Sequence, residues 1–471
     1  MANSYLTKDF GSAGNRKTMT FSFWVKRNRL GSGSDTMEAF IVADPSSYPA
    51  HHIEFTDNDQ LDIRSQKQAT GDNYYFRYIT DRVFRDTSSW YHFVVAIDTT
   101  QGTESDRLKL YVNGVQNLKW STATQSGGFT QNTDTYFNHG DKGERIGHHT
   151  GVSTSYAHFN LAHYHFVDGT ALAPTVFGQF DSTTGEWKPI LNPSVTYGTN
   201  GFFLKFENAG AMGTDSSGNS KTWTVNGNLK QSISTPSNLF ATFNANHSGA
   251  GQQNVISVAG TQVDHANDSY TSKITCATLG MQKGKWYWET KLSTSGGNTY
   301  IGFVRNGGLD ATKNIRESKG IGDGDDANSW SYAVTTRSAD LKVIRYNNGD
   351  AVSSYGPDIS NGDIIQTWLD LDNGKVWWGV NGTLNTVSGT ANPATGAYPH
   401  ITFTVGDEFY IPAISMFGFQ GAVQVQANFG EGRFGTSALS SAVNDTGGNG
   451  TFEYDPLGFY SICTSNIKDY G

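Results

Sequence analysis

The chain has 471 residues, of which 54 are glycine, 11 are proline and 13% are aromatic. Charged residues make up 16%, against roughly 25% in a typical soluble domain, and the formal net charge is −9. The length predicts two or three domains. Many glycines and aromatics with few charges favour a turn-rich β protein over a helical one. The acidic balance excludes nucleic acid and anionic membrane surfaces as expected partners, because both require basic patches.

The sequence contains no signal for membrane insertion or secretion. No apolar run approaches the ~18 residues that span a bilayer, and residues 1–21 lack the apolar segment of a signal peptide. We therefore expect the protein to fold in the compartment where it is made. Cys276 and Cys463 are far apart and form no metal or redox motif. We expect two buried, inert thiols, and a disulfide between them stays an alternative.

The first half of the chain reads as a series of short strands. Residues 17–27 alternate, with Thr18, Thr20, Ser22 and Trp24 on one face and apolar side chains on the other. One short helical turn is predicted at 171–178, and no helix of ten residues or more is predicted anywhere. Further strands, separated by turn-forming clusters, are predicted at 39–42, 52–55, 74–79, 90–97, 108–112, 146–147, 159–168 and 201–206.

The second half repeats this pattern after a polar stretch, and we place the linker at 228–238. Asn-Gly, a strong turn signal, occurs nine times in the chain. The predicted fold is all-β, with two tandem antiparallel β-sandwiches at 1–228 and 239–435. A short irregular tail at 436–471 is expected to pack on a sandwich. Strands of the second sandwich are predicted at 285–292, 300–304, 330–334, 342–346, 409–415 and 423–429.

Residues 362–382 carry the strongest hairpin signal. The Asn-Gly pair at 373–374 predicts a two-residue type I′ turn, which pairs Asp372 with Lys375. Alternation gives the hairpin one apolar face for the core, formed by Thr367, Leu369, Leu371, Val376, Trp378 and Val380. The opposite face carries Trp368 and Trp377, whose indoles must be covered by a second layer, the other domain or a neighbouring subunit. We expect an interface between domains or subunits.

Several segments resemble known β-sandwich families. The first half contains TMTFSFWVKR, WYHFVVAIDTTQG, LKLYVNGV and DSSGNSKTW, which resemble a laminin-G-like domain of the concanavalin A-like lectin/glucanase superfamily. The second half contains GKWYWETKL, YIGFV, GDIIQTWLDLDNGKVWWGVNG and ANFGEGRF, which resemble a SPRY domain. The order of these pieces, with linking phrases such as HFVDGTALAPTVFGQFDSTTGEWKP and GTFEYDPLGFYSICTSNI, resembles structural proteins of tailed bacteriophages, particularly marine ones. The resemblance implies adhesion rather than catalysis.

The sequence gives no complete catalytic motif. Glucanases of this superfamily carry a Glu-x-Asp-x-x-Glu strand, which supplies the paired carboxylates of glycoside hydrolysis. Here Glu104–Asp106 is followed by Lys109 in the last position, and residues 453–455 are followed by Gly458. Neither a Gly-x-Ser-x-Gly elbow nor His-Glu-x-x-His is present. We expect no enzymatic activity.

Two groups of residues are weak metal candidates. His163 and His165 alternate on a strand and share one face, where they could ligate a transition metal. Polar members of a half-buried strand are the favoured interpretation. The histidine pairs at 51–52 and 148–149 lie beside turns and are expected to be exposed. The second group is Asp323, Asp325 and Asp326, whose clustered carboxylates could bind Ca²⁺. A solvated acidic loop is the simpler interpretation.

Aromatic residues expected on outer faces or loops are the better candidates for ligand contacts, because exposed aromatic rings stack on sugars and anchor protein interfaces. One group follows a turn-rich stretch and the other follows the long loop at 305–329, where SPRY-like domains vary their binding loops. The candidate ligand-binding residues are Tyr74, Tyr75, Tyr78, Trp330 and Tyr332.

These observations predict a bacteriophage virion protein, made in the host cytoplasm without a signal peptide. The first hypothesis is a tail-fibre or tail-tip adhesin that recognises a host surface glycan or protein. The alternative is a capsid or tail decoration protein that binds other virion proteins. It has some support because a strand begins within about twenty residues of Met1 and no coiled-coil or repetitive shaft follows. A polysaccharide depolymerase ranks last. A homotrimer is expected by analogy, and no cofactor is expected, with Ca²⁺ a minor alternative.

Overall fold

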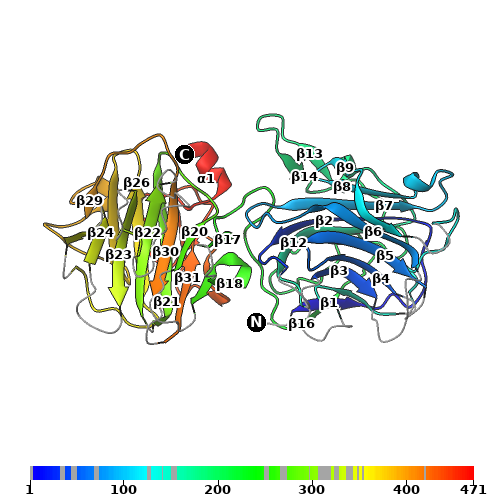
Figure 1. Cartoon of the computed structure of the whole chain (residues 1–471), viewed down its shortest axis with the longest axis horizontal. Helices are drawn as coiled ribbons and strands as arrows, with labels where there is room; N and C mark the ends of the chain where they lie inside the picture. Colours follow the sequence, from blue (N-terminus) through cyan, green and yellow to red (C-terminus); the bar gives the residue numbers. More distant parts are fainter. Residues whose placement is uncertain are drawn as a thin grey trace. The chain divides into compact units, whose positions relative to one another are not determined.

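The structure is a computed structural model of the chain. It describes residues 4–31, 38–43, 50–67, 74–124, 129–140, 142–149, 156–248, 254–265, 273–295, 297–305, 320–322, 328–335, 343–346, 349–352, 355–417 and 421–471. The chain divides into two compact units, Met1–Ser237 and Asn238–Gly471. Figure 1 draws unit 1 in blue to green and unit 2 in green to red. Among the described residues, no helix is long and apolar enough to cross a membrane.

Unit 1 is built from two antiparallel sheets. The smaller sheet has the order β15 (Phe202–Leu204), β12 (Phe159–Asp168), β2 (Thr18–Arg27), β7 (Tyr91–Asp98), β8 (Leu108–Val112) and β9 (Val115–Asn117). The larger sheet has the order β10 (Trp120–Thr124), β6 (Tyr74–Val83), β5 (Gln60–Gln66), β4 (His51–Phe55), β3 (Glu38–Ala43), β11 (Glu144–Ile146), β1 (Tyr5–Lys8) and β16 (Thr224–Asn226). Short elements complete the unit, namely the hairpin of β13 (Gly178–Phe180) with β14 (Trp187–Pro189) and the 3-10 turns η1 (Glu104–Asp106) and η2 (Pro174–Val176).

The core of unit 1 lies between these sheets, as strand alternation predicts. Met19, Phe21, Phe23 and Val25 of β2 are buried in it. The ring of Phe23 lies 4.6 Å, centroid to centroid, from that of Phe40 on the opposite sheet. The first predicted sandwich is therefore observed, with the predicted face of β2 inward.

Unit 2 is a second sandwich. One sheet has the order β17 (Phe243–Ser248), β20 (Lys273–Ala277), β30 (Tyr410–Phe417), β22 (Asn298–Arg305), β23 (Ser329–Thr335), β24 (Val343–Tyr346) and β25 (Gly349–Val352). The other has the order β18 (Val255–Ser257), β19 (Gln262–His265), β31 (Val423–Asn428), β21 (Lys285–Ser295), β26 (Ile364–Asp370), β27 (Lys375–Val380) and β28 (Thr383–Leu384), with β29 (Ile401–Thr402) also paired to β27. The remaining elements are η3 (Val258–Gly260), η5 (Pro393–Thr395), β32 (Arg433–Phe434), β33 (Ser437–Ala438), β34 (Val443–Asn444), β35 (Thr451–Phe452) and α1 (Thr464–Tyr470).

The predicted hairpin is present as β26 and β27, but its register was wrong by two residues. Asp370, rather than Asp372, pairs with Lys375, and Trp368 lies directly opposite Trp377. Gly374 has a φ of +61°, whereas Asn373 is not among the residues with positive φ, so the turn is not type I′. A shift of two keeps every side chain on its face. The apolar face therefore does line the core, as predicted.

The carboxylate of Asp370 explains the longer turn. It accepts hydrogen bonds from the backbone N–H groups of Asp372 and Asn373, each at 3.0 Å, and from Asn373 Nδ2 at 2.9 Å. The N–H of Leu371 donates to the carbonyl of Gly284 at 2.9 Å. These hydrogen bonds satisfy backbone N–H groups in a connection of four residues, 371–374. In a two-residue turn, residues 371 and 372 would instead belong to the strand.

The tail packs on a sandwich, as predicted, but it is more ordered than expected. It contains β34, β35 and the helix α1, and it joins unit 2 along its whole length. Phe452 and Phe459 are fully buried against Tyr287, Trp368 and Trp377 on the outer face of the larger sheet. A bridge pairs Phe240 with Cys463, so the two ends of unit 2 meet. Cys276 and Cys463 are buried free thiols, as predicted.

Glu289 of β21 fastens this tail. Its carboxylate is fully buried and accepts hydrogen bonds from the backbone N–H groups of Glu453 and Tyr454, at 3.0 and 2.8 Å. Tyr287 Oη and Asn428 Nδ2 donate to it as well, at 3.0 and 3.1 Å. The Glu289 side chain thus accepts hydrogen bonds from two consecutive backbone amides of the tail that covers the sheet.

Candidate functional site

In unit 1, charged side chains cover the face of β4, β5 and β6 that points away from the core. Strand alternation places them there, because Ile53, Phe55, Leu61 and Ile63 occupy the core face. The register sets His52 opposite Arg64, Glu54 opposite Asp62, and Arg64 opposite Arg77. We call the five residues His52, Glu54, Asp62, Arg64 and Arg77 the charged layer.

Arg64 is the centre of the charged layer. Its Nη2 lies 2.8 Å from Glu54 Oε1, and its Nη1 lies 2.5 Å from Asp62 Oδ2. Arg77 Nη2 reaches the same oxygen of Asp62 at 2.8 Å. Glu54 and Asp62 are fully buried. Buried charges need partners, and here two guanidinium groups offset two carboxylates.

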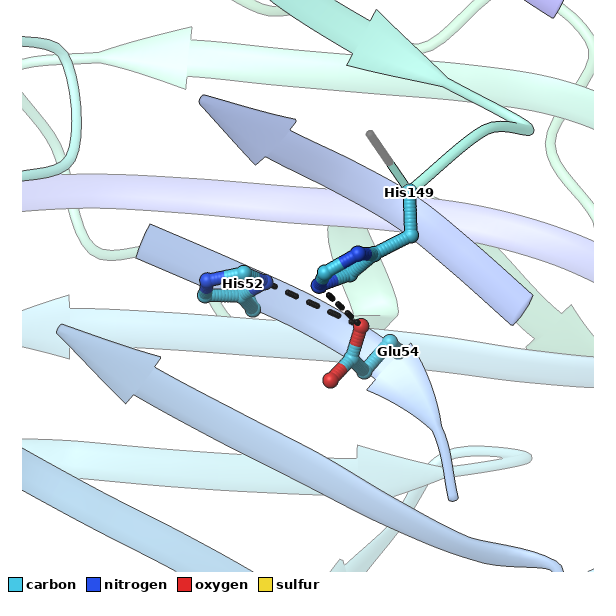
Figure 2. A group of neighbouring side chains, drawn as sticks. All are labelled: His52, Glu54 and His149. Carbon is cyan, nitrogen blue, oxygen red and sulfur yellow. Dashed lines mark ion pairs between the residues drawn. The ribbon is translucent and has the colours of Figure 1, made fainter. Parts of the chain in front are cut away.

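His149 joins the charged layer from a distant segment. Just after β11, the N–H of Gly147 donates to the carbonyl of Ala39 at 2.8 Å, which holds the chain against the sheet. His149 Nε2 then lies 3.7 Å from Glu54 Oε2, and His52 Nδ1 lies 3.7 Å from the same oxygen. Figure 2 shows both contacts ending on one carboxylate oxygen. The two imidazoles stack, with centroids 5.0 Å apart.

The protonation states of this group follow from burial and from Arg64. Burial lowers the pKa of His52 to about 3, and the charge of Arg64 acts in the same direction. Burial also lowers the pKa of His149. For Glu54 burial acts the opposite way, but the charge of Arg64 together with the effects of His52 and His149 outweighs it and holds the pKa below its usual range. At neutral pH the group is two neutral imidazoles and one carboxylate.

The expectation that residues 51–52 and 148–149 are exposed is wrong, because all four side chains are buried. Their signal was present in the sequence: in HHIEF, His52 and Glu54 alternate with the core residues Ile53 and Phe55. That pattern fixes their face but cannot show that the face is covered. The approach of His149 depends on tertiary structure and has no local signal.

The charged layer argues against glycoside hydrolysis. Glu54 and Asp62 lie opposite each other on neighbouring strands, which is the kind of placement a catalytic carboxylate pair needs. Such a pair also needs one protonated member with a raised pKa. The pKa of Glu54 is lowered instead, and Arg64 and Arg77 together offset the charges of Glu54 and Asp62. Glu54 is therefore not suited to act as a general acid.

Tyr74, Tyr75 and Tyr78 lie in strand β6, where the sequence predicts a strand at 74–79, but the expectation that their rings are exposed is wrong for Tyr74 and Tyr78. Tyr74 and Tyr78 are buried, and Tyr75 is half-buried against the core. Tyr78 contacts Trp120 with centroids 5.0 Å apart. The guanidinium of Arg77 lies 5.6 Å from the ring centroid of Tyr74. Their rings fill the sandwich and its charged face.

The expectation that Trp330 and Tyr332 are exposed is also wrong, although the strand predicted at 330–334 is present. Both lie in strand β23 and point into the core of unit 2, where Trp330 is 4% exposed and Tyr332 fully buried. Trp330 stacks on Phe303 with centroids 5.0 Å apart. The alternation of SWSYAV, with Ser329 and Ser331 between the aromatics, is the signal that would have placed them inward.

Trp368 and Trp377 are buried as expected, but not by another domain or subunit. The tail of unit 2 covers them through Phe452 and Phe459. Trp368 Nε1 donates to the carbonyl of Pro456 at 3.1 Å, and Trp377 Nε1 donates to that of Ala397 at 3.0 Å. The predicted interface is therefore a layer within unit 2.

The histidine pair on β12 follows the simpler expectation. His163 and His165 have ring centroids 6.4 Å apart, and a bulge between Ala162 and His165 interrupts the strand. His165 is buried, with Nδ1 2.8 Å from Tyr197 Oη. Within the described part of the chain, the residues whose ligand atoms all lie within 4.8 Å of one another are His52, Glu54 and His149. Asp323, Asp325 and Asp326 lie outside the described residues.

Unit 1 also exposes apolar side chains that sequence reasoning missed. Phe180, on the hairpin of β13 and β14, is 59% exposed and packs edge-on against Trp187 with centroids 4.9 Å apart. Trp187 lies against Gly114, which adjoins the exposed Val115. Val115 and Leu118 line one depression, whose other lining residues include the charged Asp81, Arg82 and Lys119. We call Val115, Leu118, Phe180 and Trp187 the apolar ridge.

Comparisons with known proteins assign both sandwiches to families. A model described as the concanavalin A-like lectin/glucanases superfamily matches residues 2–152, and a SPRY domain model matches residues 285–414. The chain carries a concanavalin A-like domain and a SPRY domain. The concanavalin A-like match includes His52, Glu54 and His149, whereas the SPRY match ends before the tail. A search of curated protein sequences found no match.

Solved structures similar to the chain include two SPRY domains. The SPRY domain of human HERC1 is 15% identical, with a TM-score of 0.28, and the match covers 39% of this chain and 96% of that one. The TRIM65 PSpry domain is 18% identical, with a TM-score of 0.29, and the match covers 40% of this chain and 88% of that one.

Proposed function

We propose that this protein is a non-catalytic recognition protein of a bacteriophage virion, a tail-fibre or tail-tip adhesin that binds a glycan or protein on the host surface. It would act as a homotrimer alongside other virion proteins. Two β-sandwich domains of families rich in binding modules support a recognition role. The pairing of Glu54 and Asp62 with Arg64 and Arg77 supports the absence of catalysis by these carboxylates. The phage assignment rests on the phrases that resemble phage structural proteins.

The apolar ridge is the observation that carries this proposal. Large apolar side chains that stay exposed next to one another mark contact surfaces. Phe180 offers an aromatic ring for stacking on a sugar or for anchoring a protein interface, and Trp187 holds it in place. The loop aromatics chosen from the sequence do not offer this, because four of the five are buried.

A whole-cell binding assay tests the proposal. The purified chain is labelled and incubated with host cells, with and without competing host polysaccharide. Binding that the polysaccharide abolishes, or binding to protease-sensitive sites, supports the adhesin. Absence of binding overturns it and favours the decoration protein, and shortening of the polysaccharide favours the depolymerase.

A pair of matched variants tests the surface. Phe180→Ser should weaken cell binding by about tenfold, since a buried aromatic contact contributes roughly 0.5–1.5 kcal/mol beyond its area. Tyr398→Ser, which removes an aromatic ring 55% exposed on unit 2, should leave binding unchanged. Equal loss in both variants, or none in Phe180→Ser, would place the binding surface elsewhere.

A further inference from the structure

Three potential ligand atoms in unit 1 converge without bonding to one another. His52 Nδ1, His149 Nε2 and Glu54 Oε2 are buried, and none has a hydrogen-bond partner among the residues that the structure describes. The 3.7 Å separations of each nitrogen from the oxygen are too long for hydrogen bonds. Buried polar atoms normally have hydrogen-bond partners or ligands. We therefore expect an ion or a water molecule to bind between these three atoms.

The spacing suits a transition-metal ion. Zn²⁺ binds imidazole nitrogen and carboxylate oxygen at about 2.0–2.2 Å, which in a tetrahedron separates the ligand atoms by about 3.4 Å. The two nitrogen–oxygen separations exceed this by only about 0.3 Å. All three atoms lie within 4.8 Å of one another, so small rotations of the two rings bring them onto one ion.

The surroundings prepare these side chains for a metal. Arg64 pairs with Glu54 Oε1, which leaves Oε2 free and fixes the plane of the carboxylate. Such contacts behind the ligands orient them and tune their affinity. The positive charge of Arg64 is balanced by Asp62.

We propose that His52, Glu54 and His149 bind one divalent transition-metal ion, Zn²⁺ in the simplest case. Two nitrogen ligands disfavour Ca²⁺ and Mg²⁺, which prefer oxygen. Three protein ligands leave a fourth position for water. The ion ties β4 to the segment that follows β11, two parts of the chain almost a hundred positions apart, and therefore stabilises unit 1 independently of receptor recognition.

Direct binding tests the proposal. The full chain is treated with a chelator, dialysed and titrated with ZnCl₂, and bound zinc is measured by elemental analysis. We expect one Zn²⁺ per chain and a visible absorption band of four-coordinate metal when Co²⁺ is used instead. His52→Gln and His149→Gln should each weaken zinc binding by about 100-fold or more, since even changes behind the ligands cost 10–100-fold.

His163→Gln is the matched control, because it removes a half-buried histidine of the same unit outside the cluster. It should leave zinc affinity unchanged. If a cluster variant fails to fold, hydrogen exchange of the wild-type chain decides the question: zinc should protect residues 51–55 and 142–149 relative to the chelated protein. Absence of bound zinc, or equal loss of affinity in His163→Gln, overturns the proposal and leaves water as the occupant.

Discussion

Removal of the Glu289 carboxylate should release the tail of unit 2. Glu289→Ala deletes the acceptor of four hydrogen bonds, two of them from the consecutive amides of Glu453 and Tyr454. The two donors on the sheet side, Tyr287 and Asn428, stay buried and lose this partner. The donors in the tail can regain water only if the tail lifts away. The substitution therefore shifts the balance toward local opening.

The structure sets the size of this effect. Each buried donor left without a partner costs about 1–3 kcal/mol. The two amides of the tail recover part of this by hydration, so we expect a loss of about 3–5 kcal/mol in local stability, similar to breaking a buried charged contact. At 1.4 kcal/mol per factor of ten, hydrogen exchange of the tail amides should accelerate by about 100-fold to 1,000-fold or more.

Hydrogen exchange measured by mass spectrometry checks this prediction peptide by peptide. Peptides from 443–463 should exchange faster in Glu289→Ala, while peptides of unit 1 serve as an internal reference. Glu408→Ala is the control, because it removes a half-buried glutamate of unit 2 whose ion pair among the described residues is a 3.8 Å contact with Arg305. Unchanged exchange of the tail in Glu289→Ala would mean that the apolar cluster alone holds it, and the reasoning would fail.

The same residue gives a pH dependence. Burial raises the pKa of Glu289 from 4.5 to about 7, although its four donors favour the charged form. Between these values the folded chain keeps a proton that the unfolded chain has lost, so stability falls as pH rises through this window. The fall is at most about 3 kcal/mol. Glu289→Gln cannot titrate and should flatten this slope; an unchanged slope would assign it to another group.

Three further predictions concern unit 2. Gly374→Ala should lower the unfolding free energy by more than about 2 kcal/mol in urea, because φ is +61° and the added Cβ would lie 2.0 Å from the carbonyl oxygen of Phe403; an unchanged midpoint would contradict the turn described. Burial lowers the pKa of His400 to about 4, so stability should fall as pH drops from 6.5 toward 4, and His400→Gln should reduce this acid sensitivity. The double variant Trp368→Ser, Trp377→Ser should loosen the tail in hydrogen exchange and leave the oligomeric state unchanged; altered assembly with an intact tail would restore a subunit interface.

Strand periodicity predicted which side chains of the hairpin face the core but not their exact partners. The alternation of side chains between the two faces of a strand is a local property, so Val376 and Trp378 could be assigned to the core face from the sequence alone. Register also depends on what the turn residues bond to. Asp370 caps the turn and Leu371 bonds to Gly284, which lies at the start of another strand. The hydrogen bond between Leu371 and Gly284 joins residues far apart in the chain, so the sequence of the hairpin alone does not predict it.

Burial of polar and aromatic residues was harder to predict than strand position. The charged layer lies on a face that alternation marks as outward, and its burial depends on segments far away in sequence, including the one that carries His149. Trp330 and Tyr332 differ from expectation for the opposite reason, because the alternation of their own strand, and not the neighbouring long loop, decides that they point into the core. The zinc proposal rests on a proximity that required the fold.

The closing contacts of unit 2 have a consequence for its biosynthesis. The N–H of Ala241 donates to the carbonyl of Ile462, and the N–H of Thr464 donates to that of Leu239, both at 2.9 Å. Unit 1 can complete its core while translation continues, but unit 2 must wait for residues translated after 440. Until then the indoles of Trp368 and Trp377 face water or a chaperone. Aggregation during synthesis should therefore depend more on how fast the ribosome delivers these last segments than on the strength of either core.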